Sequence, residues 1–489
     1  MTHKIVLHTE ANPEDNAMLQ ALYSRSADSV LTHLERLKKV GSGKFMQQYY
    51  VGYGHNSIAD CGFITFYLEG ISMLAAKAIE DNPLYNGQES SSRYIDWSTQ
   101  PFYNPYTGEF KEEAEALLTK MREFYVSQIE PVKQHLRSQF PNEGADESTY
   151  EKAITAKSFD ILRGFLPSGA CTNVAATFSL RKAREHLELL SIHPLAEVRG
   201  IAIDAYESLK ESFPNSFPDL KVRTIDEMRY DNDLYNFYVN PPKHFNANYF
   251  LASRGTLEAE VEVVDSTLFD KEMGKSCTNS TRAKKTALHK HSLYNRLTRY
   301  NIKGMIDFGS FRDLQRHRGG YCGMPLIDNV NGYHPWYINQ LPTGSMAALS
   351  ELINSISKFL EKTIPSDKVT YTVEQATKAR AASFSAKLKN QYLLPMMTLV
   401  DVVLSYDLNQ LTYVAELRGS PTVHPTLRAF VQDVATQVLD DSPGLNLFVN
   451  MDRDEFSIKR GKQDITKVEV VETKPIQVET KKPEEDVGD

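Results

Sequence analysis

The sequence predicts an α+β fold built from two homologous units in tandem. Short alternating apolar runs, typical of strands, and longer runs with a helical apolar period occur in both halves of the chain. Stretches of the first half also recur in the second half. His55 and His289 each stand fifteen residues before a glycine, and the Leu-Pro at Pro167 recurs at Pro395. Such spacing indicates one ancestral unit copied once.

The repeat sets the expected boundaries. We predict unit one over residues 1–225 and unit two over 226–455, with a Pro/Ser-rich hinge at 211–222. The segment 456–489 is charged and almost without aromatic residues, and we expect a disordered tail there.

Each unit is expected to run in the same order. A strand comes first, "GFITFYLEG" (62–70) or "RYNIKGMIDF" (299–308), and a helix follows, "ISMLAAKAIED" or "GSFRDLQRHR". We expect another helix directly after each Leu-Pro. Long helices are predicted at 112–139, 182–190 and 196–210.

Composition narrows the function class. A formal net charge of -8 without a long basic block argues against a nucleic-acid polymer as partner. No signal peptide and no apolar run of about 18 residues is visible, so we expect a cytoplasmic protein without membrane contact. The four cysteines are scattered, which predicts neither disulfides nor a metal site.

The chemistry is concentrated in "FRDLQRHRGG" (311–320), where Arg316, His317 and Arg318 precede two glycines. Two cations at a helix C-terminus could simply interact with the helix dipole. The alternative is a ligand site, because guanidiniums present planar paired donors to phosphates and ring edges. Arg312, one turn earlier, favours the ligand site.

The first half lacks this Arg-His-Arg and carries "ESSSRY" (89–94) instead. Its hydroxyls, backbone N–H groups and the Arg93 guanidinium could hold a phosphate, with Ser91 in the middle, while Glu89 could accept from a base or sugar. An ordinary polar loop is the competing interpretation.

Together these motifs resemble the flavin-dependent thymidylate synthases, the ThyX family. That family carries Gly-His-x-(Ser/Thr) before an aromatic strand, then Arg-His-Arg-x7-Ser-x-Arg, then a helix led by Leu-Pro. Here the pattern is divided: the first half matches the Glu-x-Ser-x-Arg end of the loop, and the second half matches its Arg-His-Arg. Where the second half should have the Ser and Arg, it has Leu326 and Asp328.

Later positions divide in the same way. Arg163 and Arg181 occur only in the first half, with Gln391 and Asn409 in their places in the second half. Arg418 occurs only in the second half. Neither half keeps a whole set, so we predict that the halves complement each other; decay of both sites is the alternative.

The resemblance implies an enzyme that reductively methylates dUMP to dTMP, with FAD as cofactor and NADPH and methylenetetrahydrofolate as co-substrates. It implies Arg316 and Arg418 as catalytic residues that polarise the uracil. The implied FAD-binding residues are His55, Ser57, Arg181, His289, Arg316, His317 and Arg318. The implied nucleotide-binding residues are Glu89, Ser91, Arg93, Arg163 and Arg418.

Family tetramers correspond here to a homodimer of two-unit chains, which predicts one FAD and one dUMP per chain. Asp313 stands where the family has a glutamine, and a carboxylate there would repel the dUMP phosphate or alter the accepted base. A flavoenzyme acting on another pyrimidine nucleotide and an inactive nucleotide-binding relative therefore remain as alternatives.

Overall fold

The structure is a computed structural model that describes residues 12–26, 28–43, 56–93, 96–144, 146–220, 260–263, 298–328, 331–364, 373–441, 445 and 447–453. His55, His289, the predicted tail and the last two residues of the predicted hinge lie outside this part. Mixed helices and strands confirm the predicted α+β class. We call residues 1–225 the first half and 226–455 the second half.

Within the described residues, each half contains one antiparallel sheet. The first sheet has the order β1 (Phe63–Ser72), β3 (Cys171–Ser179), β2 (Asn86–Glu89). The second has the order β4 (Glu260–Val263), β5 (Arg299–Asp307), β7 (Leu399–Asp407), β6 (Tyr321–Gly323). Strands β1, β3 and β2 of the first sheet correspond to β5, β7 and β6 of the second, and β4 has no counterpart among the described residues.

The central strands β3 and β7 correct the sequence prediction, which placed helices directly after each Leu-Pro. Both segments are nine residues long and mix apolar with polar residues, and the period of so short a segment does not separate a strand from a buried helix. The helices begin only afterwards, at Leu180 and Leu408, where Ser179 and Asp407 act as N-caps.

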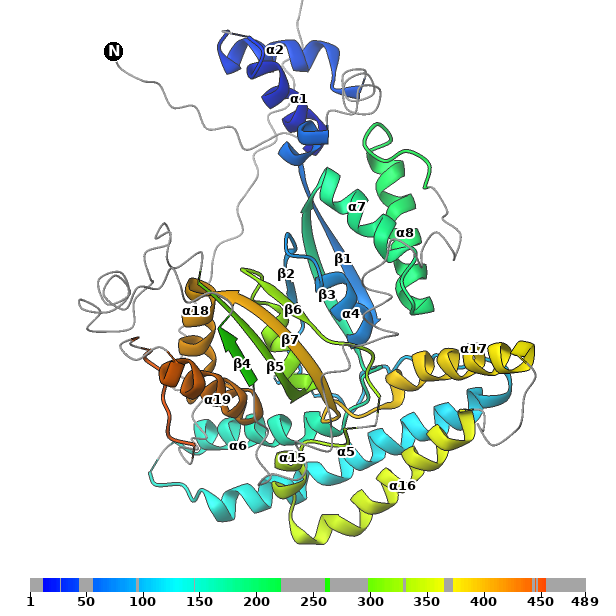
Figure 1. The fold of residues 1–489 in the computed structure, drawn as a ribbon, viewed down its shortest axis with the longest axis vertical. Coiled ribbons are helices and arrows are strands. Elements are labelled where there is room, and N and C mark those ends of the chain that lie inside the picture. Colours follow the sequence, from blue (N-terminus) through cyan, green and yellow to red (C-terminus); the bar gives the residue numbers. More distant parts are fainter. Residues whose placement is uncertain are drawn as a thin grey trace, which may run out of the picture.

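Helices surround the two sheets (Figure 1). Those of the first half are α1 (Pro13–Tyr23), α2 (Val30–Val40), α4 (Met73–Glu80), α5 (Lys111–Gln139), α6 (Glu147–Leu162), α7 (Leu180–Leu190) and α8 (Ala196–Ser212). Those of the second half are α14 (Phe308–Gln315), α15 (Pro335–Asn339), α16 (Met346–Thr363), α17 (Val373–Asn390), α18 (Leu408–Arg418) and α19 (Pro425–Asp441). Short 3₁₀ turns include η2 (Asn56–Cys61), η4 (Arg163–Phe165) and η6 (Gln391–Leu393).

The long helices α5 and α6 of the first half and α16 of the second half lie below the two sheets in Figure 1, with α5 beside α16. Among the described residues, buried side chains of both halves join in one continuous cluster, and α1 and α2 add a small one. The halves therefore stabilise each other through shared apolar burial.

The two Leu-Pro segments meet at the junction of the halves. Pro167 and Pro395 form an antiparallel bridge. The flanking hydrogen bonds come in reciprocal pairs related by an exchange of the halves: Ser168 N to Leu394 O and Met396 N to Leu166 O, both 2.8 Å, and Gly169 N to Tyr392 O and Met397 N to Gly164 O, both 2.8 Å.

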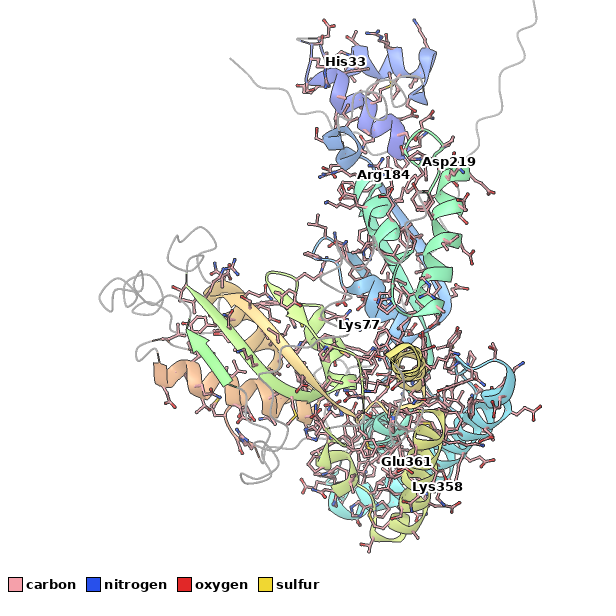
Figure 2. The ribbon with its side chains drawn as sticks, turned by 45° about the vertical axis from the view of Figure 1, so that its right-hand side comes forward. His33, Lys77, Arg184, Asp219, Lys358 and Glu361 are labelled. Atoms are coloured by element: carbon pink, nitrogen blue, oxygen red, sulfur yellow. The ribbon has the colours of Figure 1, made fainter. Side chains whose placement is uncertain are left out.

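Figure 2 shows Lys77 of α4 where the upper arm, which carries the first sheet, meets the rest of the molecule. Helices α4 and α14 contact each other at this level through Gln315, whose amide donates to the carbonyl of Lys77 at 3.1 Å. Within the described residues, no helix combines the length and apolar character needed to cross a bilayer.

Candidate functional site

The Arg-His-Arg segment follows helix α14 instead of ending it. The helix stops at Gln315, with Arg316 as its C-cap, so the predicted helix of ten residues is too long. Gly319 and Gly320 then lead the chain against β7 and α18. A Cβ at Gly320 would lie 2.3 Å from the carbonyl oxygen of Ser405, so only glycine allows this approach.

Glu89 of the first half binds arginines of the second half. The carboxylate forms a buried ion pair with Arg312, and its other oxygen lies 3.5 Å from Arg316 Nη2. The structure therefore brings the Glu-x-Ser-x-Arg strand and the Arg-His-Arg segment together within one chain.

Arg93 makes a two-pronged ion pair with a carboxylate that sequence analysis missed. Its Nε and Nη2 donate to the two oxygens of Asp160 at 2.6 and 3.0 Å, and its guanidinium also donates to Thr422 O at 3.4 Å. Ser91 Oγ accepts from Arg93 N at 3.3 Å. Asp160 stands three residues before Arg163, and an acid within one helical turn of a predicted site arginine was a usable signal.

Arg163 is buried, and two of its guanidinium nitrogens donate no hydrogen bond to any described residue. Its side chain is 2% exposed, and its Nη1 lies 4.0 Å from Asp313 Oδ2. Within the described part of the chain, Nε and Nη2 have no hydrogen-bond partner. Buried charged donors without partners are costly, and they are typical of a site that a ligand completes.

Arg418 is oriented by His317. Its Nε donates to His317 Nε2 at 2.8 Å, and its Nη2 donates to the backbone carbonyl of Asp313 at 2.9 Å. Burial, aided by the nearby Arg418 charge, lowers the pKa of His317 to about 3, so the imidazole is neutral and can accept. His317 thus positions an arginine, besides lining the cleft described below.

These arginines converge on Asp313. Burial alone would raise the pKa of this carboxyl, but neighbouring guanidiniums outweigh burial and lower it, namely those of Arg163, Arg418, Arg316 and Arg93. We call Arg93, Arg163, Arg316 and Arg418 the arginine cluster. All four were predicted as site residues, two from each half, and the structure brings them together.

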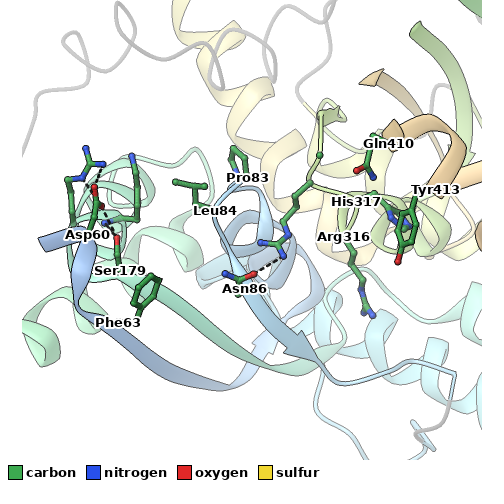
Figure 3. Close-up of a pocket in the computed structure, with 14 residues that line it drawn as sticks. Asp60, Phe63, Pro83, Leu84, Asn86, Ser179, Arg316, His317, Gln410 and Tyr413 are labelled. Carbon is green, nitrogen blue, oxygen red and sulfur yellow. Dashed lines mark hydrogen bonds and ion pairs between the residues drawn. The ribbon is translucent and has the colours of Figure 1, made fainter. Parts of the chain in front are cut away.

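A cleft opens beside the cluster (Figure 3), with a volume of about 590 Å³. Its walls come from both halves: Asp60, Phe63, Pro83, Leu84, Asn86, Ser179, Arg181 and Lys182 from the first, and Arg316, His317, Arg318, Gly319, Gln410 and Tyr413 from the second. Arg318 donates to Asn86 Oδ1 at 3.0 Å. Arg181 pairs with Asp60, with Nε at 2.8 Å from Oδ1.

The remaining predicted residues that the structure describes lie in or near this cleft. Arg181, Arg316, His317 and Arg318 line it, whereas Ser57 is exposed on η2, three residues before the lining residue Asp60. His55 and His289 lie outside the described residues.

Glu80 belongs to the segment of the first half that stands in place of the Arg-His-Arg, so complementation of the halves predicts that it faces a different pocket from Arg316. Instead it lies in the same junction, where its oxygens accept from Tyr85 OH at 3.1 Å and from Gln315 Nε2 at 3.4 Å. Burial, together with the nearby Glu89 carboxylate, raises the pKa of Glu80 to about 7. Helix α4 ends beside α14, close to the junction of the halves, and this explains the difference.

The comparison with known families agrees with this geometry. Residues 4–215 match the family described as "Thymidylate synthase complementing protein". The first half of the chain therefore resembles that family.

Curated relatives extend the likeness beyond residue 215. A "UPF0159 protein" of Chlamydia muridarum is 24% identical over 455 residues, 84% of this chain and 82% of the relative. The "UPF0159 protein Ta1429" of Thermoplasma acidophilum is 22% identical over 486 residues, 88% of this chain and 94% of the relative. The chain is therefore similar to these proteins over both of its halves.

Proposed function

We propose that the protein is an FAD-dependent, thymidylate synthase-like enzyme that reductively methylates dUMP to dTMP. Methylenetetrahydrofolate would donate the carbon and NADPH the reducing equivalents. The observation that carries this proposal is the convergence of arginines from both halves beside a cleft lined by the Arg-His-Arg segment.

The arginine cluster fits an anionic pyrimidine nucleotide. The two partnerless donors of Arg163 suit a phosphate or a ring carbonyl, and they are held rigidly by burial. Arg418 and Arg316 are oriented by His317 and Glu89, so they need little reorganisation to stabilise negative charge that develops on the uracil ring.

The cleft fits a flavin dinucleotide. Its volume lies within the ordinary range for cofactor sites, roughly 300–1,000 Å³. Phe63 and Tyr413, which line it, are 59% and 58% exposed, and such uncovered aromatic rings suit stacking against a flat ligand. Arg181, Lys182 and Arg318 supply positive charge for the pyrophosphate. Bound there, FAD would supply the hydride of the reductive step.

We infer that residues 1–225 and 226–455 are tandem ThyX-like units that form a pseudo-dimer inside one chain. The reciprocal hydrogen bonds around Pro167 and Pro395 and the matching strand orders support this. A symmetric second site would require arginines where Asp81, Leu190, Asp328 and Gln391 stand. We therefore propose one FAD and one dUMP per chain.

Two such chains would form a homodimer. Exposed apolar side chains on and near β1 support a further interface: Phe63 at 59%, Tyr67 at 73% and Leu84 at 54%. Light scattering should give twice the chain mass, and flavin absorbance one FAD per chain. Two FAD per chain would contradict complementation.

A cell-based test addresses the reaction. Wild-type protein should rescue a bacterial strain that requires thymidine, and Arg418→Ala should not, although it folds. A yellow protein that fails to rescue would favour a flavoenzyme acting on another pyrimidine nucleotide. A colourless protein that fails would favour an inactive relative.

A further inference from the structure

Asp313 is an unusual member of the site because it places a negative charge among the four cations of the arginine cluster. Its side chain lies on α14, 21% exposed, with Arg163 Nη1 4.0 Å from Oδ2. Its lowered pKa means that it stays ionised at neutral pH, although burial opposes this.

The arginine cluster does not depend on this carboxylate for its geometry. Arg93 is fixed by Asp160, and Arg316 lies against Glu89. Arg418 is fixed by His317 and by the backbone carbonyl of Asp313, which any residue at this position would provide.

The distance from Asp313 to Arg163 also indicates that the carboxylate does not fix the position of an arginine. A separation of 4.0 Å between nitrogen and oxygen exceeds hydrogen-bond length, so the attraction acts through charge alone. Burial in the core, at 2% exposure, holds the Arg163 side chain in place, and two of its nitrogens remain without partners. Asp313 therefore neutralises the site without filling its donors.

We propose that Asp313 is a resident counter-ion that competes with the anionic group of the ligand and thereby limits how much negative charge the site accepts. Where the ligand is taken to be dUMP, this proposal rests on the proposed function. Competition between Asp313 and a phosphate group does not rest on the proposed function, because it follows from the charge of Asp313 and its position among the arginines. Removing the carboxylate should strengthen phosphate binding instead of damaging the site.

Asp160 provides a matched control from the same cluster. It too is a buried aspartate beside an arginine, but it holds Arg93 through two hydrogen bonds. Asp160→Asn removes one negative charge, as Asp313→Asn does, yet it also releases Arg93. If position decides the outcome, the two substitutions should change anion affinity in opposite directions.

The experiment is calorimetry on the full chain with inorganic phosphate and with dUMP. We expect Asp313→Asn to bind phosphate on the order of tenfold tighter than wild type, as expected for one unit charge a few ångströms away in a partly buried site. Asp160→Asn should bind phosphate more weakly. Asp313→Gln serves as a second variant if Asp313→Asn does not fold.

Each outcome decides something. Unchanged or weaker phosphate binding by both Asp313 variants, or no phosphate binding by any protein, would overturn the counter-ion proposal. Equal strengthening by Asp160→Asn would overturn it too, since only net charge would then matter. Tighter phosphate binding without any dUMP binding would support the counter-ion and reject the proposed nucleotide.

Discussion

Helices α4 and α14 are equivalent elements with opposite electrostatics. Each has eight residues and begins at a side-chain N-cap: Ser72 accepts from Ala75 N and Asp307 from Ser310 N, both at 3.0 Å. Counted from these caps, Lys77 and Asp81 of α4 stand where Arg312 and Arg316 of α14 stand.

The α4 pair has opposite charges one turn apart and closes on itself as an ion pair. The α14 pair has like charges, which repel at this spacing, so both arginines turn to Glu89 in the other half. The charge reversal from Asp81 in α4 to Arg316 in α14 thus has a structural consequence. The C-terminal end of α4 pairs its own charges, whereas that of α14 needs a carboxylate from the other half. The site is asymmetric for this reason.

The largest expected effect comes from breaking that dependence with Glu89→Ala. Arg312 would then be a buried cation without its partner, and removing one member of a buried pair costs about 3–5 kcal/mol of unfolding free energy. Chemical denaturation measures this cost. Asp81→Ala at the α4 end should cost less than half as much, because Lys77 can extend its flexible stem toward water. Equal losses of unfolding free energy in the two variants would mean that the C-terminal ends of α4 and α14 depend equally on their carboxylate partners.

A smaller effect concerns the ligand rather than the fold. Arg316→Ala and Arg318→Ala should each weaken FAD or nucleotide binding by about 1.5–3 kcal/mol, the worth of hydrogen bonds to charged groups, with melting temperatures close to wild type. Flavin absorbance after gel filtration checks this. Asp81→Ala, the equivalent substitution in α4, should retain flavin. Full flavin content in both arginine variants, with a large fall in melting temperature, would instead assign these arginines to helix capping.

This asymmetry was partly predictable from sequence. The missing Arg-His-Arg of the first half and the missing Ser-x-Arg of the second indicated that Glu89 and Arg316 belong to one site, and they lie 3.5 Å apart. Long helices such as α5 and α8 followed from their apolar period and were confirmed.

Other features depend on tertiary contacts that cannot be predicted from the local sequence pattern. The segments of β3 and β7 were expected to be helices because nine residues are too few to show a clear period; pairing on both sides makes them strands. The Arg93–Asp160 pair joins residues 67 positions apart. The position of Glu80 depends on how the halves meet.

Glu80→Gln sharpens the comparison by making α4 match α14, where Gln315 stands at the equivalent position. The raised pKa of Glu80, caused first by burial and then by Glu89 and opposed by Arg316, Arg312 and Tyr85, means that the folded state holds this proton more tightly than the unfolded chain. The stabilisation is complete below pH 4.5 and is lost as pH rises through about 7.

Wild type should therefore lose roughly 1–3 kcal/mol of stability between pH 5 and 8 through this group, and Glu80→Gln should lose less. Urea denaturation at several pH values measures the difference. Parallel pH profiles for the two proteins would show that Glu80 is ionised throughout and that the junction carries a fixed negative charge.

The smallest effect is expected at the far wall of the cleft, where Arg181 pairs with Asp60. Both side chains are about one-third exposed, so the ion pair should contribute no more than about 1 kcal/mol to stability. Arg181→Ala should nevertheless weaken flavin binding several-fold, because it removes a cation that lines the cleft. Arg184→Ala is the matched control: Arg184 lies on the same helix and pairs loosely with Glu188 at 3.8 Å, but it does not line the cleft. Fluorescence titration of the apoprotein with FAD separates the two variants. Identical FAD affinities for Arg181→Ala and Arg184→Ala would remove α7 from the flavin site and confine the cofactor to the Arg-His-Arg side, where only the second half supplies positive charge.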